Sequence, residues 1–268
     1  MKELNIAILF KPVPDPAHYE RIQIDPATGI LIRQGLATVI NPDDKHALEA
    51  ALQLQEAFGG RVVLVSMAPG NAVETLKEGL AMGADEAHLC SDRSFAGADS
   101  LATSKVLASA LRKLGPFDLV LAGSASADGG TAHVPSQVGE LLGTAHLTNV
   151  TRLQIGSDGK VLLQMKLANG YQELKGTLPM VIGTRRELNT PRYTSLMGIL
   201  AAQRKTLQVW GLTDLGLKAE DVGLSGSPTQ PGRLTQPETK RKGEVLSGDT
   251  TENAQRLIGV FRSAGILA

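Results

Sequence analysis

Short apolar runs alternate with helical patterns in the first half of the chain, and this alternation strongly constrains the fold. The runs are LNIAILF, RVVLVSM, EAHLC and DLVLA, which begin at residues 4, 61, 86 and 118. Apolar residues at helical spacing follow them, most clearly over 43–58, 72–82 and 99–114. Strands that alternate with helices build right-handed βαβ units. The sequence therefore predicts an α/β fold with a doubly wound, mostly parallel, Rossmann-like sheet.

The pattern changes after residue 143. Two apolar runs at 150–155 and 161–167, separated by GSDG, predict an added β-hairpin. Further strands are expected near 171–174, 180–183 and 207–210, with a helical segment, MGILAAQRK, before the last of them.

From Thr213 the chain contains too few apolar residues for a core of its own. Residues 223–248 are rich in Gly, Ser, Thr and Pro, and 253–265 predict an amphipathic helix. Its apolar side would carry Leu257, Ile258, Val260 and Phe261. We therefore expect an α/β domain at 1–212 and a C-terminal arm at 213–268 that packs on another protein. The alternative is a linker that folds back on its own domain.

The stretch 117–142 predicts a buried strand, a loop of small residues and a helix. Thr131 is the expected N-cap of a helix that starts near Ala132, with Pro135 in its first turn. Free amides at such a helix start can bind phosphate. An ordinary strand-to-helix turn explains the loop equally well, because it matches neither GxGxxG nor GxxxxGK[ST].

Four residues lie at strand ends or at a helix start on the predicted sheet: Leu9, Asn41, Met67 and Gly123. In open α/β sheets, ligands bind outside the carboxyl ends of the strands, near the point where strand order reverses. We expect these residues to line one crevice.

The composition excludes several classes of protein. Lys plus Arg and Asp plus Glu number 27 each, and aromatic residues make up only 3%, so neither a nucleic-acid partner nor membrane insertion is expected. The one cysteine, Cys90, and five histidines without i, i+4 spacing predict no disulfide and no metal site. No catalytic triad follows from the spacing. A cytoplasmic location is expected, since no signal peptide or membrane helix is apparent.

Several segments resemble one known family. KPVPD follows the first strand, and Asn41-Pro42 begins the first long helix. GLAMGADEAHL lies at 79–89, and LNTPRYTSLMGILAAQRK lies at 188–205. Together they resemble the β subunit of electron-transfer flavoproteins, which includes the FixA proteins, over essentially the whole chain.

The resemblance implies a heterodimer with a larger α subunit that carries FAD. The β subunit would bind an adenine nucleotide, scaffold the α subunit and exchange electrons with a flavin dehydrogenase, such as an acyl-CoA dehydrogenase. That nucleotide would be AMP in ordinary carriers and FAD in electron-bifurcating, NADH-oxidising members. The C-terminal arm would wrap onto the α subunit, and any redox chemistry would belong to the flavin.

Carried over by position, the resemblance implies a nucleotide site of small and polar residues. These are Leu9, Asn41, Pro42, Asp43, Asp44, Met67, Gly123, Ser124, Ala125, Asp128, Gly129, Gly130, Thr131, Ala132, His133 and Val134. The phosphate would meet 128–134, where Ala132-His133-Val134 is closer to the FAD-binding type. The choice between AMP and FAD stays open.

The resemblance also implies a partner-recognition loop at 191–200, with Arg192, Tyr193 and Leu196 in contact with the dehydrogenase. The residues alone favour Leu196 as a buried helix start. A different class of function, a nucleotide-sensing module of the stress-protein type, remains an alternative. A related ATP pyrophosphatase is less favoured, since KPVPD stands where an SGGxDS-like loop would be.

Overall fold

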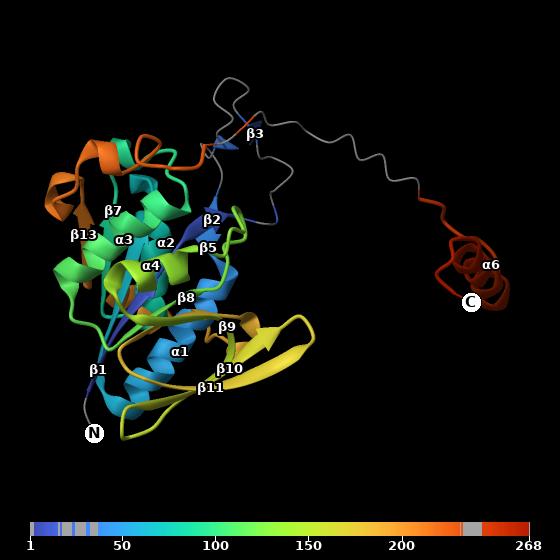
Figure 1. Ribbon diagram of the computed structural model, residues 1–268, viewed down its shortest axis with the longest axis horizontal. Coiled ribbons are helices and arrows are strands. Elements are labelled where there is room, and N and C mark those ends of the chain that lie inside the picture. Colours follow the sequence, from blue (N-terminus) through green and yellow to red (C-terminus); the bar gives the residue numbers. More distant parts are fainter. Residues whose placement is uncertain are drawn as a thin grey trace. The chain divides into compact units, whose positions relative to one another are not determined.

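The computed structural model describes residues 3–15, 17, 23–24, 31–32, 37–230, 232 and 243–267. The chain divides into two compact units, Met1–Gly232 and Arg233–Ala268. The first unit is an α/β domain with helices on both faces of one large sheet (Figure 1). The second unit contains one helix, α6 (Thr250–Ser263).

The sheet has nine strands in the order β11-β10-β9-β12-β8-β1-β6-β7-β13. In this spatial order, all neighbouring strands from β9 through β12, β8, β1, β6 and β7 to β13 are parallel. β10 pairs antiparallel with both β9 and β11. The predicted doubly wound, mostly parallel sheet with an added hairpin is therefore confirmed. The strands are β1 (Leu4–Leu9), β6 (Gly60–Met67), β7 (Glu86–Cys90), β8 (Leu119–Gly123), β9 (Ala145–Ile155), β10 (Lys160–Leu167), β11 (Gly170–Thr177), β12 (Met180–Thr184) and β13 (Thr206–Trp210).

Two small antiparallel pairs lie outside this sheet. β2 (Pro12–Pro14) pairs with β5 (Thr38–Ile40), directly before the first long helix. β3 (Gln23–Ile24) pairs antiparallel with β4 (Leu31–Ile32).

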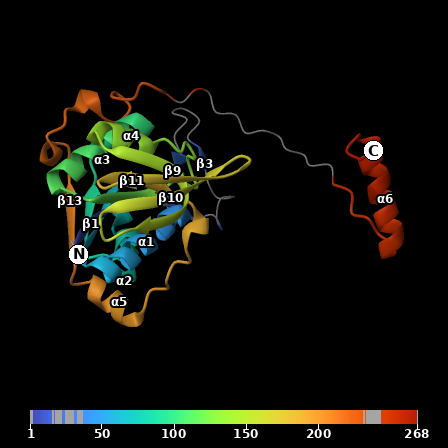
Figure 2. The ribbon, with the colours of Figure 1, turned by 60° about the horizontal axis from the view of Figure 1, so that its bottom comes forward.

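Helices cover both faces of the sheet, so the central strand β1 is buried on both sides. Ile6 and Ile8 belong to one apolar cluster, whereas Ala7 and Leu9 belong to the other. Such two-sided burial explains why the strands are continuously apolar. α1 (Pro42–Phe58) and α2 (Val73–Met82) contribute side chains to the first cluster. α3 (Ser100–Leu114) and α4 (Val134–Leu142) contribute side chains to the second. α5 (Leu196–Ala202) lies beside α2 (Figure 2).

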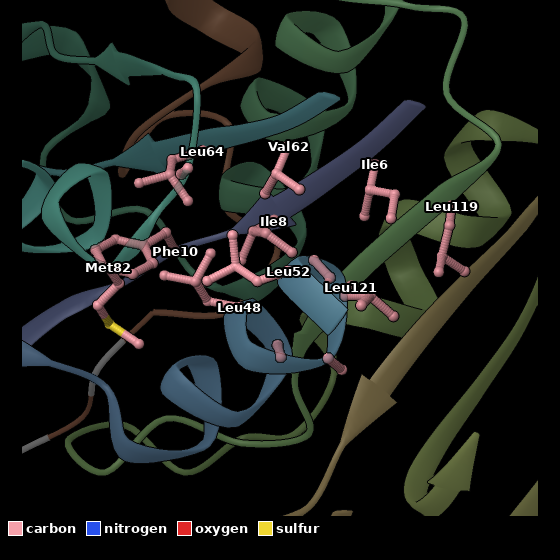
Figure 3. Close-up of a cluster of buried hydrophobic side chains, with 14 of the residues drawn as sticks. Ile6, Ile8, Phe10, Leu48, Leu52, Val62, Leu64, Met82, Leu119 and Leu121 are labelled. Carbon is pink, nitrogen blue, oxygen red and sulfur yellow. The ribbon is translucent and has the colours of Figure 1, made fainter. Parts of the chain in front are cut away.

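The centre of the first cluster is formed by α1 and the strands beneath it. Figure 3 shows Leu48 and Leu52 of α1 lying against Ile8 of β1, with Leu121 of β8 beside them. Leu48, Ile8 and Leu121 are fully buried. This packing fixes α1 over the middle of the sheet and so sets the position of the helix N-terminus.

The packed domain extends beyond the boundary that the sequence predicts. Val222 is fully buried with the α3 and α4 cluster, and Leu215 and Leu217 pack against the same cluster. Asp99, the N-cap of α3, also accepts hydrogen bonds from the amide and hydroxyl of Thr229, at 3.0 and 2.6 Å. These contacts place 213–230 in the α/β unit, because its scattered leucines and Val222 fill gaps at the end of α3.

The second unit contains the predicted terminal amphipathic helix. α6 spans Thr250–Ser263, is capped by the Asp249 carboxylate and has no buried residue. Leu257, Ile258 and Val260 are exposed. Within the described residues, no helix is long and apolar enough to cross a bilayer.

Replacing Leu48 with Ala should lower the free energy of unfolding by about 2–5 kcal/mol, because the fully buried side chain leaves a cavity. Urea denaturation measures the change. The same replacement at Leu167, whose side chain is 47% exposed, should cost about 0.5 kcal/mol or less. Equal losses for the two variants would contradict the packing described for α1.

Candidate functional site

Strand order reverses at β1. The chain runs from β1 to β6 and β7 on one side, then returns to β8 on the other side of β1. Such a switch point opens a crevice at the carboxyl ends of the two central strands. Leu9 and Gly123 end those strands, as the sequence predicts. The polar residues around this point form the candidate site.

The Asp44 carboxylate joins three segments at this switch point. Its Oδ2 accepts a hydrogen bond from the Lys11 amide at 2.7 Å, just after β1. Its Oδ1 accepts one from the Gly123 amide at 2.8 Å, at the end of β8, and one from Nδ2 of Asn41 at 2.9 Å. Asp44 lies in the first turn of α1, where a negative charge is favourable. One buried side chain thus ties together β1, α1 and β8.

Burial dominates the titration of this carboxyl and raises the pKa of Asp44 to about 7. The hydrogen bonds from Asn41, Lys11 and Gly123 act in the opposite direction, because they favour the ionised form. The side chain is only 4% exposed, so water contributes little to its solvation.

Asn41 holds the loop that follows β8. Its Nδ2 donates to the carbonyl of Ala125 at 3.0 Å, and its Oδ1 accepts from the Ala127 amide at 3.0 Å. Its own amide donates to the Lys11 carbonyl at 2.9 Å. Pro42 follows in the first turn of α1, where its missing N–H costs nothing. The Asn-Pro pair therefore starts α1 and anchors the small-residue loop at once.

Close packing explains the glycine at the end of β8. A Cβ at Gly123 would lie 2.5 Å from Oδ1 of Asp44 and 2.6 Å from the Cβ of Asp43. The next residue, Ser124, is buried, and its hydroxyl accepts a hydrogen bond from the Asn149 amide at 2.8 Å. The start of the loop is therefore rigid.

The middle of the loop carries an ion pair. Nζ of Lys11 lies 2.6 Å from Oδ1 of Asp128 and 3.2 Å from the hydroxyl of Ser126. Asp128 also accepts from the Gly129 amide at 2.7 Å. Asp128 thus connects Lys11, after β1, with the backbone of the loop.

The helix after the loop begins later than the sequence predicts. Thr131 does not cap it: α4 starts at Val134, and the N-cap position is His133, without a side-chain cap hydrogen bond. Gly130 and Ala132 have φ of 61° and 57°. Left-handed backbone at these two residues delays the helix, and Pro135 lies in its first turn as predicted. The segment from Gly129 to His133 is exposed to solvent.

A cavity of about 390 Å³ opens beside the loop. Its lining residues are Asn41, Asp43, Ala125, Ser126, Ala127, Arg185, Arg186 and Glu187. Nε of Arg186 donates to Oδ1 of Asp43 at 2.8 Å. Arg185–Glu187 are not among the nucleotide-site residues that the sequence predicts. Their position directly after β12, which ends at the same edge as β8, is the signal that could have found them.

Two predicted site residues contribute packing. The Leu9 side chain is 5% exposed and belongs to the core on the α3 and α4 side. Met67 is partly buried against the same core. Both lie at strand ends around the switch point, below the loop that Asn41 and Asp44 hold.

The predicted recognition loop forms an exposed apolar surface. Tyr193 is 99% exposed, and Leu196 and Met197 are 73% and 74% exposed. The interpretation of Leu196 as buried helix start is therefore wrong. The Ser195 hydroxyl accepts a hydrogen bond from the Gly198 amide at 3.0 Å and so caps α5, in which Leu196 is the first residue.

Arg192 has an intramolecular role in this loop. Its guanidinium lies 2.8 Å from Glu49 and 2.6 Å from Glu56, both on α1. Burial acts to raise the pKa of the Glu49 carboxyl, but hydrogen bonds from Arg192 lower it below its usual range. Asn189 adds a hydrogen bond to the His46 carbonyl at 2.9 Å. The loop is thus held against α1 while Tyr193 and Leu196 face solvent.

Asp44 gives a pH-dependent contribution to stability. Its pKa in the folded protein is raised from 3.8 to about 7, so the folded state binds the proton more tightly than the unfolded state. The contribution is fully present below about pH 4 and is lost as pH rises toward 7, by up to about 4 kcal/mol. Urea denaturation of the wild type and Asp44→Asn should show the wild-type advantage shrinking over this range. Parallel pH profiles for the two proteins would contradict this assignment.

Within the part of the chain that the structure describes, no group of three His, Cys, Asp or Glu side chains is placed to hold a metal ion. Cys90 is fully buried, and burial raises the pKa of its thiol to about 12. The candidate site is therefore the crevice of hydrogen-bonded loops at the switch point, together with the exposed recognition loop.

Comparisons with known proteins agree with this geometry. A model of the electron transfer flavoprotein domain matches residues 28–215. The electron transfer flavoprotein subunit beta of Thermoanaerobacterium thermosaccharolyticum is 40% identical, over 98% of this chain and 100% of its own length. Subunit CarD of the caffeyl-CoA reductase-Etf complex of Acetobacterium woodii is 41% identical over the same shares. Protein FixA of Bradyrhizobium diazoefficiens is 36% identical, over 94% and 88%. The chain belongs to the electron transfer flavoprotein β subunit and FixA family, whose members take part in electron transfer.

Proposed function

We propose that this chain is the β subunit of a heterodimeric electron-transfer flavoprotein that binds an adenine nucleotide in the crevice at the end of β1 and β8. The supporting observation is the Asp44 junction, where one buried carboxylate receives N–H donors from Lys11, Asn41 and Gly123. This junction fixes a loop of small residues at the switch point, where α/β sheets bind their ligands.

Backbone groups do most of the binding in this proposal. The exposed segment from Gly129 to His133 and the first amides of α4 face the phosphate, and the Thr131 hydroxyl adds a donor. Gly123 lets α1 approach β8 closely, and Asn41 sets the loop through Ala125 and Ala127. A bound flavin supplies reversible electron transfer, and the residues of this chain position the nucleotide that accompanies it.

A second candidate is an NADH-oxidising complex in which this chain itself holds FAD. The cavity of about 390 Å³ between the loop and Arg185–Glu187 supports it, because a dinucleotide needs more room than AMP. Arg185 supplies positive charge at that end, whereas the Arg186 guanidinium is paired with Asp43. The caffeyl-CoA reductase-Etf complex contains a relative of similar length, which is compatible with such an assembly.

Denaturing the purified complex and identifying the released nucleotides separates the candidates. One FAD and one AMP per heterodimer are expected for the simple carrier. Two FAD per heterodimer, with flavin reduction by NADH, are expected for the second candidate. Release of no adenine nucleotide from this chain, with the α subunit's FAD retained, would reject nucleotide binding here. Isolation as a stable chain without an α subunit would instead favour a free-standing nucleotide sensor.

The exposed loop around α5 is proposed as the surface that meets the flavin dehydrogenase. Tyr193, Leu196 and Met197 are exposed large hydrophobic residues, and the Arg192 guanidinium is paired with Glu49 and Glu56. Leu196 then serves as an anchor for an apolar pocket on the partner. In this proposal Arg192 supports the loop, in place of the partner contact that the resemblance implies.

The terminal unit is proposed to cover part of the α subunit. α6 presents Leu257, Ile258 and Val260 without burying any of them within its own unit. An amphipathic helix of this kind gains stability when its apolar side packs on another surface.

Replacing Leu196 with Ala should reduce kcat/KM for reduction by the partner dehydrogenase by about tenfold or more, through a higher KM. The bound nucleotide should be unchanged, because Leu196 lies outside the crevice. Val209→Ala is the matched control, since Val209 is 53% exposed on β13. Loss of nucleotide with unchanged partner kinetics would reject the docking role.

A further inference from the structure

Lys11 occupies a fixed position at the centre of the site. Its amide donates to Oδ2 of Asp44 at 2.7 Å, and its carbonyl accepts from the Asn41 amide at 2.9 Å. The backbone of Lys11 is therefore held by the same junction that holds the loop. The Lys11 side chain pairs with Asp128, which lies 117 residues later in the sequence.

Asp128 brings a negative charge into the segment that the proposed function assigns to a phosphate. Its side chain is 8% exposed, whereas that of Lys11 is 42% exposed. Burial acts to raise the pKa of the Asp128 carboxyl, but the Lys11 ammonium and the hydrogen bonds lower it below its ordinary value. Asp128 is therefore ionised at neutral pH. A carboxylate repels an approaching phosphate unless a cation balances it.

The loop has other attachments that do not involve the Lys11 side chain. Asn41 bonds to the Ala125 carbonyl and the Ala127 amide, and the Gly130 amide donates to the Ser126 carbonyl at 3.0 Å. Removing the ammonium of Lys11 therefore changes the charge of the loop more than its attachment to α1.

We propose that Lys11 is a positioning residue whose charge neutralises Asp128, so that residues 128–134 can accept the phosphate of an adenine nucleotide. This inference rests on the proposed function and adds a residue outside the predicted site. Lys11 acts through Asp128, and the nucleotide phosphate is bound by backbone donors. Direct contact between Lys11 and the phosphate is the competing arrangement, which the half-exposed side chain leaves accessible.

The test compares Lys11→Met, Asp128→Asn and the double variant in the full chain, purified with its co-purifying subunit. The readouts are the nucleotide released on denaturation and the dissociation constant for added AMP after dialysis. Lys77→Met is the matched control, because Lys77 forms an exposed ion pair with Glu74 at 2.9 Å on α2.

We expect Lys11→Met to weaken AMP binding by about tenfold or more, since it leaves a negative charge near the phosphate. Lys77→Met should bind AMP as tightly as the wild type. Asp128→Asn should bind AMP more tightly than the wild type, because it removes a negative charge near the phosphate and keeps the Lys11 ammonium. The double variant should recover most of the lost affinity, because both charges are then absent. Recovery also shows that the chain folds without the Lys11 ammonium.

Two results would overturn the inference. A Lys11→Met variant that binds AMP as the wild type does would show that the charge is not needed. A double variant as weak as Lys11→Met would show that Lys11 contacts the phosphate itself. A wild-type complex that binds neither AMP nor FAD in this chain would reject the proposed function, and the role of Lys11 with it.

Discussion

The buried Asp44 carboxylate is the interaction on which the rest of the site depends. It receives N–H donors from the end of β1, the start of α1 and the end of β8, three segments far apart in sequence. Burying this group is costly, as its raised pKa shows, and the cost is offset by three hydrogen bonds of good length. The crevice therefore keeps its shape through one buried carboxyl group that joins three segments.

The sequence was sufficient to predict those parts of the structure that depend on local patterns. Continuous apolar runs such as that of Ile6 and Ile8 predict strands buried on both faces, and the alternation with helices predicts the parallel sheet. Asn41-Pro42 predicts the start of α1 because proline is suited to a first turn. Strand ends at Leu9 and Gly123 then place the crevice, since the carboxyl ends of neighbouring parallel strands meet.

Other features depend on contacts between distant residues and could not be predicted from local pattern. The backbone at Ala132 is left-handed, and α4 begins only at Val134. The helix-start signals of the residues alone predict an earlier start. The pairing of Lys11 with Asp128 joins residues that are 117 positions apart in the sequence. Likewise, Val222 is buried although its segment is polar, because it fills a gap beside α3. Conversely, Leu196 is exposed although it is a large apolar residue at the start of a helix.

One helix links the two surfaces that the proposed function uses. α1 carries Asp44 in its first turn, and further along it carries Glu49 and Glu56, which hold Arg192 of the recognition loop. Leu48 and Leu52 lock the same helix onto the centre of the sheet. The proposed nucleotide crevice and the proposed docking loop are therefore both attached to the same helix. Because side chains of α1 are packed against the sheet, this attachment gives the two surfaces a common support.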